Sequence, residues 1–370
     1  MKYIKNLYDD ICTFENLYLA YKNARKNKRF RDEVLEFSSN VEEYLMDIRK
    51  ELIEQTYKVG KYREFFVYEP KKRLIMALPF KDRVVQWAIY QKLNPYFTKG
   101  YISDSFACIE GRGAHQAVQR LHYWLRQIGR KPGKYYYLKL DISKYYYRID
   151  HDVLVEILSR KIKDTKLMKL LEGIIRCEDH SFGLPLDASL EETDVRINNK
   201  GMPIGNLTSQ MFANIYLNEL DQYVKRKLRI HYYVRYMDDV IILHESKQEL
   251  HKIKKVIETF LDEKLKLNLN NKTAIRPVTL GIEFVGYKVW NTHIKLRKST
   301  ALKMKRRLKH LKKQYERGEI EIEDVRATMA SYNGLMKHCN SFRLRSKLYD
   351  TLVFTRKSEP DNDDENGGCE

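Results

Sequence analysis

The chain has 370 residues, 43% of them apolar, a formal net charge of +19 and a pI near 9.4. This composition excludes a disordered chain, and no stretch approaches the roughly 18 to 20 consecutive apolar residues of a membrane span. Five widely spaced cysteines without a C-x-x-C pair argue against a disulfide framework and a cysteine zinc site, and no signal peptide is recognisable. We therefore expect a cytoplasmic protein with a nucleic-acid partner, or else a lysine-rich protein without one.

The first part of the chain is expected to alternate helices with one pair of strands. Residues 1–57 have apolar side chains at helical spacing, with a basic connection over 23–33. Aromatic and branched residues in 63–69 and 73–78 predict two short strands joined by a turn. The elements expected next are a helix from Asp82 to Leu93 that ends at Asn94-Pro95, an amphipathic helix over 114–128 and a basic turn over 129–134.

The remainder begins with an apolar run, 135–141, that predicts a buried strand. The elements that follow are helices around 152–177, a loop or small hairpin over 182–200, a helix over 208–229, two strands within 231–244, a helix over 246–264 and a strand pair or bent strand over 280–290. From residue 299 the pattern is helical and basic, with eleven lysines and arginines and one acid between 295 and 317. A boundary is therefore expected near 292–300.

The charge is unevenly distributed. Residues 358–370 contain six acids and no base, and without them the net charge rises from +19 to +25. The acidic end is expected to be disordered and solvated, so the body of the protein is more basic than its total charge indicates.

Tyr236-Met237-Asp238-Asp239 places two adjacent acids between two apolar strands. Adjacent buried carboxylates repel each other, and a cation with a preference for oxygen ligands, such as Mg²⁺, relieves that repulsion. Asp141 ends the strand expected at 135–141, and the three acids could hold two Mg²⁺ ions about 4 Å apart for phosphoryl transfer. The alternatives are a polar turn with two solvated aspartates, and an N-cap role for Asp141.

A glycine- and proline-containing loop, 201–210, precedes the long helix. Glycine permits close approach of the backbone to a ligand, and a helix start favours contacts to phosphate. The alternative is an ordinary loop in which Asn206 or Thr208 caps the helix.

In combination, the acid-bearing strand 138–146, the loop and helix 201–217 and the acidic hairpin resemble the three palm motifs of reverse transcriptases. Segments 73–89 and 105–118 resemble finger motifs of group II intron-like enzymes, and 283–289 resembles a later palm motif. The resemblance extends from about residue 60 to 350 and implies an α+β, right-hand polymerase with fingers, an antiparallel-sheet palm and a helical thumb. The divisions it implies are an N-terminal helical extension (1–57), fingers (58–134), a palm (135–292, with finger-side helices inserted around 152–200), a basic thumb (293–350) and an acidic disordered tail (351–370).

The resemblance also implies roles for individual residues. Asp141, Asp238 and Asp239 would be catalytic and, with the Ile142 carbonyl, would bind two Mg²⁺ ions, for which Mn²⁺ is a possible substitute. Tyr146 would exclude a ribose 2′-OH, so the product would be DNA. The nucleotide-binding candidates are Arg73, Lys81, Arg83, Tyr146, Ile204, Gly205, Gln210 and Lys272. The candidates for binding nucleic acid on the thumb are Lys303, Arg306, Arg307, Lys309 and Lys313. Core packing of Tyr146 and solvated positions for Arg73, Lys81, Arg83 and Lys272 remain the alternatives.

One departure concerns the subtype. Group II intron enzymes usually have glutamine and proline where this chain has Ile204 and Gln210, and its pattern resembles reverse transcriptases of diversity-generating retroelements, as does 331–345. That resemblance implies error-prone copying of a template RNA opposite adenine, binding of an RNA/DNA hybrid and dNTPs, a small basic pentameric accessory protein and a bacterial or phage source. The alternatives are an antiphage-defence reverse transcriptase and a non-catalytic RNA-binding scaffold.

Overall fold

The computed structural model describes residues 3–68, 72–189, 192 and 195–356. The chain forms two compact units, one built from 1–117 and 134–276 and the other from 118–133 and 277–370. The predicted turn between the first two strands falls largely on 69–71, and most of the predicted acidic tail falls on 357–370; both lie outside the described residues. No helix in the described part of the chain is long and apolar enough to cross a membrane.

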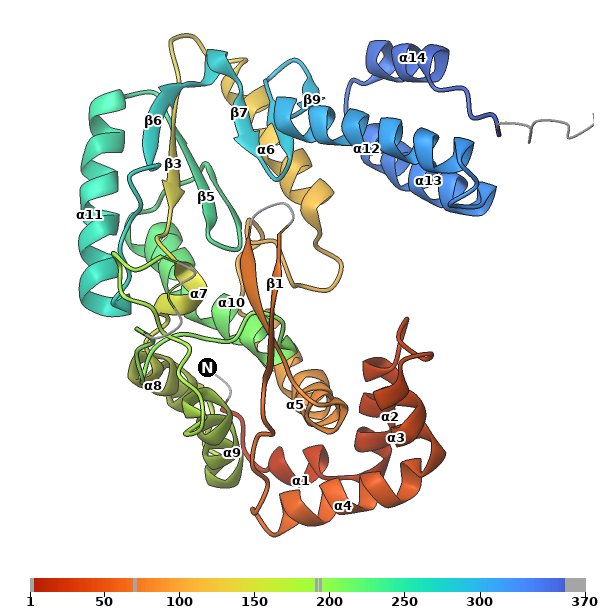
Figure 1. The fold of residues 1–370 in the computed structure, drawn as a ribbon. Helices are drawn as coiled ribbons and strands as arrows, with labels where there is room; N and C mark the ends of the chain where they lie inside the picture. Colours follow the sequence, from red (N-terminus) through yellow and green to blue (C-terminus); the bar gives the residue numbers. More distant parts are fainter. Residues whose placement is uncertain (1–2, 69–71, 190–191, 193–194, 357–370) are drawn as a thin grey trace, which may run out of the picture. The chain divides into compact units, whose positions relative to one another are not determined.

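The N-terminal part of the first unit is helical, as predicted. Its helices are α1 (Tyr8–Ile11), α2 (Phe14–Ala24), α3 (Asp32–Ser39) and α4 (Val41–Ile53), and the basic connection lies between α2 and α3. The strands β1 (Arg63–Val67) and β2 (Arg73–Ala77) pair antiparallel, which confirms the predicted strand pair. Figure 1 shows this hairpin and the four helices in orange and red.

Helix α5 (Phe80–Thr98) continues beyond the end that the sequence predicts, so the prediction of a stop at Asn94-Pro95 is wrong. Proline has no N–H and removes one helical hydrogen bond. Leu93, Asn94 and Phe97 are nevertheless buried, and their packing keeps the chain helical for one more turn. Tertiary contacts outweigh the local preference at this position.

A four-stranded sheet in the order β4-β5-β3-β6 carries the predicted acidic residues. Its strands are β3 (Tyr136–Asp141), β4 (Tyr233–Tyr236), β5 (Asp239–His244) and β6 (Ala274–Pro277). β5 pairs antiparallel with both β3 and β4. Their buried apolar side chains, such as Leu138, Leu140 and Ile242, belong to the main core of the unit.

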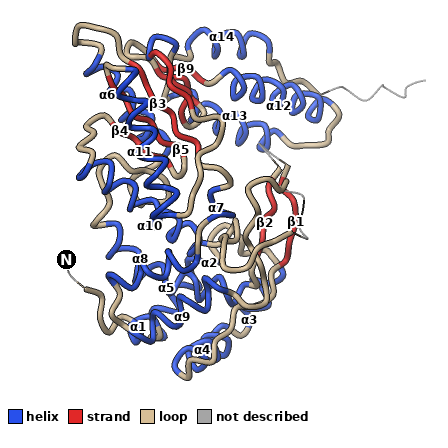
Figure 2. The backbone as a smooth tube through the Cα atoms, turned by 90° about the vertical axis from the view of Figure 1, so that its left-hand side faces the viewer, coloured by secondary structure: helices blue, strands red, loops and turns tan. Residues whose placement is uncertain are grey.

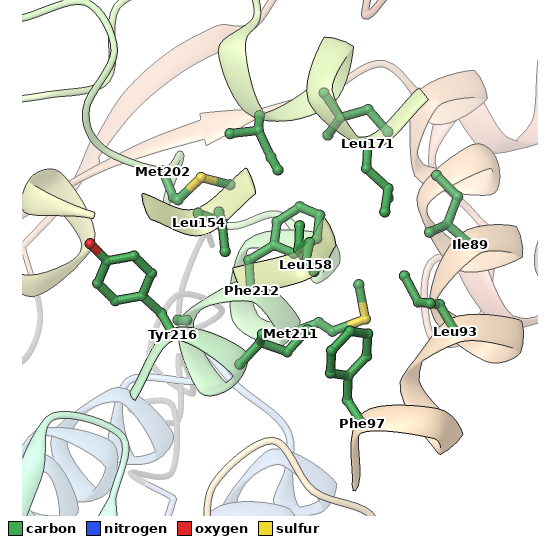
Figure 3. Packing of buried hydrophobic residues seen from close by; sticks show 14 of the residues in the cluster. Ile89, Leu93, Phe97, Leu154, Leu158, Leu171, Met202, Met211, Phe212 and Tyr216 are labelled. Atoms are coloured by element: carbon green, nitrogen blue, oxygen red, sulfur yellow. The ribbon is translucent and has the colours of Figure 1, made fainter. Parts of the chain in front are cut away.

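Helix α10 (Leu207–Gln222) is buried almost all round and continues into a π-helical turn, Tyr223–Lys227. Figure 3 shows Met211, Phe212 and Tyr216 of this helix packed among residues of α5 and of α8 (His151–Lys161). The other elements of the unit are the start of α6 (Ala114–Ile128), α7 (Tyr145–Arg148), α9 (Thr165–Arg176) and α11 (Lys247–Leu265). Helices α8 and α9 lie side by side (Figures 1 and 2).

The second unit combines most of α6 with a small sheet and three helices. The sheet is β7 (Ile282–Phe284), β8 (Tyr287–Val289) and β9 (Ile294–Leu296), and the helices are α12 (Lys298–Glu316), α13 (Ile322–Lys337) and α14 (Phe342–Thr351). Met304, Leu308 and Leu311 form the buried face of α12, as their spacing predicts, and Leu352 and Phe354 pack against the same core. The predicted mixed fold with antiparallel sheets is confirmed; its division into fingers, palm and thumb stays a prediction.

Candidate active site

The sheet register brings the predicted acids together. Asp141 is the last residue of β3 and lies directly opposite Asp239, the first residue of β5. Asp238 precedes Asp239 in the hairpin turn, whose Met237 has a left-handed backbone with φ of +52°. Ordinary strand pairing between residues about 100 positions apart therefore places three carboxylates at one end of the sheet.

The electrostatics of Asp238 show that these carboxylates affect one another. Burial raises the pKa of Asp238, and the charges of Asp239 and Asp141 raise it further. Its own backbone N–H and the Arg73 guanidinium act in the opposite direction. The ionised form is therefore disfavoured in this setting, and a cation among the three carboxylates would stabilise it.

The three aspartates fit a Mg²⁺ ion by their chemistry, because Mg²⁺ prefers carboxylate and carbonyl oxygens. In the described part of the chain, however, no three acidic, histidine or cysteine side chains are arranged to hold a metal ion by themselves. Polymerase-type sites complete the Mg²⁺ ligand set with substrate phosphates rather than with an all-protein cage. This arrangement is compatible with a site that closes around a triphosphate.

The backbone next to Asp141 argues against its alternative role as a helix cap. The residue at the N-cap of α7 is Lys144, not Asp141. The Asp141 carbonyl accepts a 2.7 Å hydrogen bond from the Asn270 N–H, and the Ser143 N–H donates to the Asn268 carbonyl. Neither bond uses the carbonyl of Ile142, which is the backbone ligand that the resemblance implies.

Tyr146 lies on α7, and its carbonyl accepts a 2.7 Å hydrogen bond from the Met202 N–H of the glycine-containing loop. Burial raises the pKa of Tyr146 most, followed by the nearby Cys108 and Asp238. The ring therefore lies within electrostatic reach of the acidic turn, and it also packs against the main core. Its place fits both the predicted sugar gate and the packing alternative.

The glycines of the loop have conformational reasons to be glycine. Gly201 has φ of +86°, and a Cβ there would lie 2.5 Å from the carbonyl carbon of Phe182. Gly205 has φ of +123°, beside Ile204, whose carbonyl accepts a 3.1 Å hydrogen bond from the Met76 N–H of β2. The loop is thus fastened to the β1–β2 hairpin.

The alternative of simple helix capping is not supported. Asn206 occupies the N-cap of α10 but makes no side-chain cap bond. Its amide instead donates to the Tyr62 hydroxyl at 2.9 Å.

The predicted triphosphate ligands differ in their surroundings. Arg73 is exposed at the start of β2 and acts on the pKa of both Asp238 and Tyr146. Lys81 pairs with Glu51 at 2.5 Å, and Arg83 pairs with Glu33 at 2.8 Å. These two cations are directed towards α4 and α3, so only Arg73 of the three is brought to the acids.

Lys272 lies in a turn that contacts β3. Its N–H donates to the Asn270 side chain at 3.1 Å. The neighbouring Thr273 hydroxyl accepts a hydrogen bond from the Asp141 N–H at 3.2 Å. The turn that carries Lys272 is thereby fixed next to Asp141.

A comparison with known proteins identifies the family of this chain. A family model described as reverse transcriptase (RNA-dependent DNA polymerase) matches residues 61–289, which is more than half of the chain. The chain belongs to the reverse transcriptase family. Membership in this enzyme family implies dependence on a divalent metal ion.

Two curated relatives are similar to this reverse transcriptase over much of its length. Protein YkfC of Escherichia coli (strain K12) is 26% identical over 280 residues, covering 66% of this chain and 71% of YkfC. Group II intron-encoded protein LtrA of Lactococcus lactis subsp. cremoris is 24% identical over 374 residues, covering 82% of this chain and 58% of LtrA. The chain therefore spans little more than half the length of LtrA.

A solved structure of apo telomerase from Candida Tropicalis, truncated from its C-terminal domain, aligns with a TM-score of 0.46 and 15% identity. The alignment covers 65% of this chain and 55% of that chain. A similarity at this level carries no functional conclusion.

Sequence reasoning missed one residue of this reverse transcriptase that touches the acids directly. The Lys139 ammonium lies 2.9 Å from Asp239 Oδ1. Lys139 precedes Asp141 by two residues on β3 and therefore shares its face of the sheet, which was a usable signal. This ion pair offsets part of the repulsion among the carboxylates.

Cys108 is the second residue that sequence reasoning missed. Its thiol donates a 3.3 Å hydrogen bond to Gln210 Oε1 at the start of α10. It also contributes to the raised pKa of Tyr146 and of Tyr236, after burial in both cases. Cys108 and Gln210 therefore lie beside the predicted sugar gate and the acidic hairpin.

The predicted nucleic-acid-binding residues of the reverse transcriptase lie on α12 in the second unit. They are exposed, whereas Met304, Leu308 and Leu311 of the same helix are buried. The exposed basic residues are Lys303, Arg306, Arg307, Lys309 and Lys313. Their exposure leaves them accessible to phosphates, and their role stays a prediction.

Proposed function

We propose that this chain is an RNA-directed DNA polymerase that extends a primer with dNTPs on an RNA template. The observation that carries the proposal is the register of β3 and β5, which opposes Asp141 to Asp239 with Asp238 in the adjoining turn. Two Mg²⁺ ions, when bound, would lower the pKa of the primer hydroxyl and neutralise the pyrophosphate. Asp141, Asp238, Asp239 and the Ile142 carbonyl would hold them.

The other site residues would bind and orient the substrates. Arg73 supplies a cation near the acids for the triphosphate. Tyr146 would clash with a 2′-OH and so select deoxynucleotides. Exposed basic residues of α12 would hold the template–primer duplex through its phosphates, so binding would weaken steeply as salt increases.

Primer extension tests this proposal. The wild type should incorporate dNTPs on an RNA template with Mg²⁺, and a variant with Asp238→Ala and Asp239→Ala should not, while both bind RNA similarly. Asp262→Ala is a matched control because Asp262 is an exposed acid on α11. Polymerisation by the double variant would refute the assignment, and a wild type that binds RNA without extending primers would instead be a non-catalytic scaffold.

We further propose that the enzyme makes error-prone cDNA in a diversity-generating retroelement of bacterial or phage origin, with a small basic pentameric accessory protein as partner. The support is the residue pattern at Ile204 and Gln210, together with the contact that joins Gln210 to Cys108 at the site. Sequencing of cDNA made in cells tests this proposal. Substitutions directed at template adenines would support it, whereas a faithful or homopolymeric product would indicate a defence role.

A further inference from the structure

Arg235 precedes the acidic hairpin and is fully buried on β4, with 0% of its surface exposed. Burying a guanidinium in a protein core is costly unless its charge is paired and its N–H groups are hydrogen-bonded. The partners of this side chain therefore indicate what the buried charge does in this unit.

Two of its nitrogens form a fork with one acid. Arg235 Nε donates to Asp221 Oδ1 at 2.8 Å, and Arg235 Nη2 donates to Asp221 Oδ2 at 2.7 Å. Asp221 lies in the last turn of α10 and is also fully buried. The Tyr233 hydroxyl donates to the same carboxylate at 2.6 Å. This bidentate geometry fixes the plane of the guanidinium against the helix.

The remaining nitrogen reaches the acidic turn. Arg235 Nη1 donates to the Met237 carbonyl at 3.0 Å and to Asn214 Oδ1 at 3.3 Å. Met237 is the left-handed residue of the turn, directly before Asp238. The planar Arg235 side chain thus connects α10 to the backbone that orients Asp238 and Asp239.

The face of α10 that carries Asn214 and Asp221 also contacts the loop that carries Cys108. The Asn214 amide donates to the Ala107 carbonyl at 2.9 Å. The Arg235 backbone pairs with this loop as well, by accepting from the Phe106 N–H and donating to the Asp104 carbonyl, each at 2.9 Å. Asn214 and Asp221 are seven residues apart and therefore share one face of the helix.

We propose that Arg235, held by Asp221, is a positioning residue that fixes the Met237 turn so that Asp238 and Asp239 can bind divalent metal. The inference rests on the proposed polymerase function. Asp221 orients the guanidinium, the guanidinium holds the carbonyl of Met237, and Asn214 joins this assembly to the 104–107 loop. None of these groups is proposed to touch a substrate.

A charge-free variant separates positioning from folding. Replacing a buried ion pair by apolar residues of similar volume is often neutral or stabilising. The variant Tyr233→Phe, Asp221→Leu, Arg235→Met removes the whole pair, and it should keep cooperative unfolding but lose the donor to Met237. Loss of groups that orient metal ligands typically costs about 10- to 100-fold in metal affinity or activity.

The measurement is Mn²⁺ binding by electron paramagnetic resonance, with a dideoxy-terminated primer on RNA and the next dNTP, alongside kinetics with an extendable primer. We expect a Mn²⁺ affinity and a kcat about 10- to 100-fold below the wild type, with KM for primer–template within about 3-fold. Arg235→Lys is the second variant if the first does not fold cooperatively. It keeps a buried cation but lacks the planar fork, so the same losses are expected.

Leu220→Ala is the matched control, because Leu220 is fully buried on the same helix next to Asp221. It should lower Tm and leave Mn²⁺ affinity and kcat within about 2-fold of the wild type, since it makes a cavity but keeps the Asp221–Arg235 fork and its bond to Met237. Charge-free and lysine variants that match the wild type, or a control that loses as much as they do, would overturn the inference. A wild type that neither binds Mn²⁺ nor extends primers would instead overturn the proposed function.

Discussion

Asp238→Asn should stabilise the metal-free protein while it abolishes primer extension. Burial and the charges of Asp239 and Asp141 raise the pKa of Asp238. The folded protein therefore binds the proton of the Asp238 carboxyl group more tightly than the unfolded chain does. The stabilisation from that proton is complete at acid pH and is lost as the pH rises through the raised pKa. Near neutral pH the folded protein therefore carries a disfavoured charge, which asparagine removes.

The expected magnitude follows from Coulomb's law. Two carboxylates about 6 Å apart repel by about 3 kcal/mol at an effective dielectric constant of about 20. Because Asp238 and its neighbours are only half-buried, and because Lys139 lies against Asp239, solvent and the lysine reduce the repulsion. We expect a gain of about 1 kcal/mol in the free energy of unfolding after this screening, or about 2 °C in Tm.

The assay is thermal unfolding followed by circular dichroism near pH 7.5, once with EDTA and once with Mg²⁺. The asparagine variant should unfold at a higher temperature than the wild type in EDTA, and the difference should shrink with Mg²⁺ because a cation relieves the same repulsion. Asp262→Asn, at an exposed position on α11, should change Tm little in either buffer. A variant less stable than the wild type in EDTA would refute the electrostatic reasoning.

Three further predictions address the nucleotide side of the site and its loop. Iodoacetamide should label the exposed Cys108, and a template–primer with dNTP should protect it from labelling. Mass spectrometry measures the labelling. Equal labelling with and without substrates would contradict the placement of Cys108 beside the substrate site. Tyr146→Val should raise kcat/KM for ribonucleotides by about 10-fold, or about 1.4 kcal/mol, in single-nucleotide incorporation, and unchanged selectivity would favour a packing role. Gly201→Ala should lower the free energy of unfolding by about 2 to 4 kcal/mol, because Gly201 has a positive φ and a Cβ there would lie 2.5 Å from Phe182. Gly173→Ala should raise the free energy of unfolding by about 0.5 to 1 kcal/mol, because Gly173 lies within α9 with open space around it. Chemical denaturation compares the two variants.

Much of the sheet and the acidic cluster could be predicted because their signals are local. Apolar runs lie beside Asp141 and the Asp238-Asp239 pair. A two-residue turn between apolar strands places its acids at the end of the sheet, independently of the rest of the fold. Glycine at 201 and 205 likewise indicates an unusual loop backbone, although residue type alone does not give the positive φ that both adopt. These features depend on few partners distant in the sequence.

The parts that could not be predicted depend on tertiary partners. The acids that pair with Lys81 and Arg83 lie at least 30 positions away, on helices whose packing no local pattern specifies. The Arg235–Asp221 pair requires α10 to lie against β4, and a buried arginine is not distinguishable from a surface one by spacing. Burial of Leu93 and Phe97 carries α5 past Pro95 against the local rule.

The carboxylates of Asp141, Asp238 and Asp239 should make this chain a metal-dependent, RNA-templated DNA polymerase. Single-nucleotide primer extension across a Mg²⁺ titration, with the wild type, Asp141→Asn and the exposed-site control Asp262→Asn, tests it most directly. We expect Mg²⁺-dependent dNTP incorporation by the wild type and the control, and a loss of at least about 100-fold for Asp141→Asn at every Mg²⁺ concentration. Incorporation by Asp141→Asn at the wild-type rate, or incorporation by the wild type without divalent metal, would contradict it.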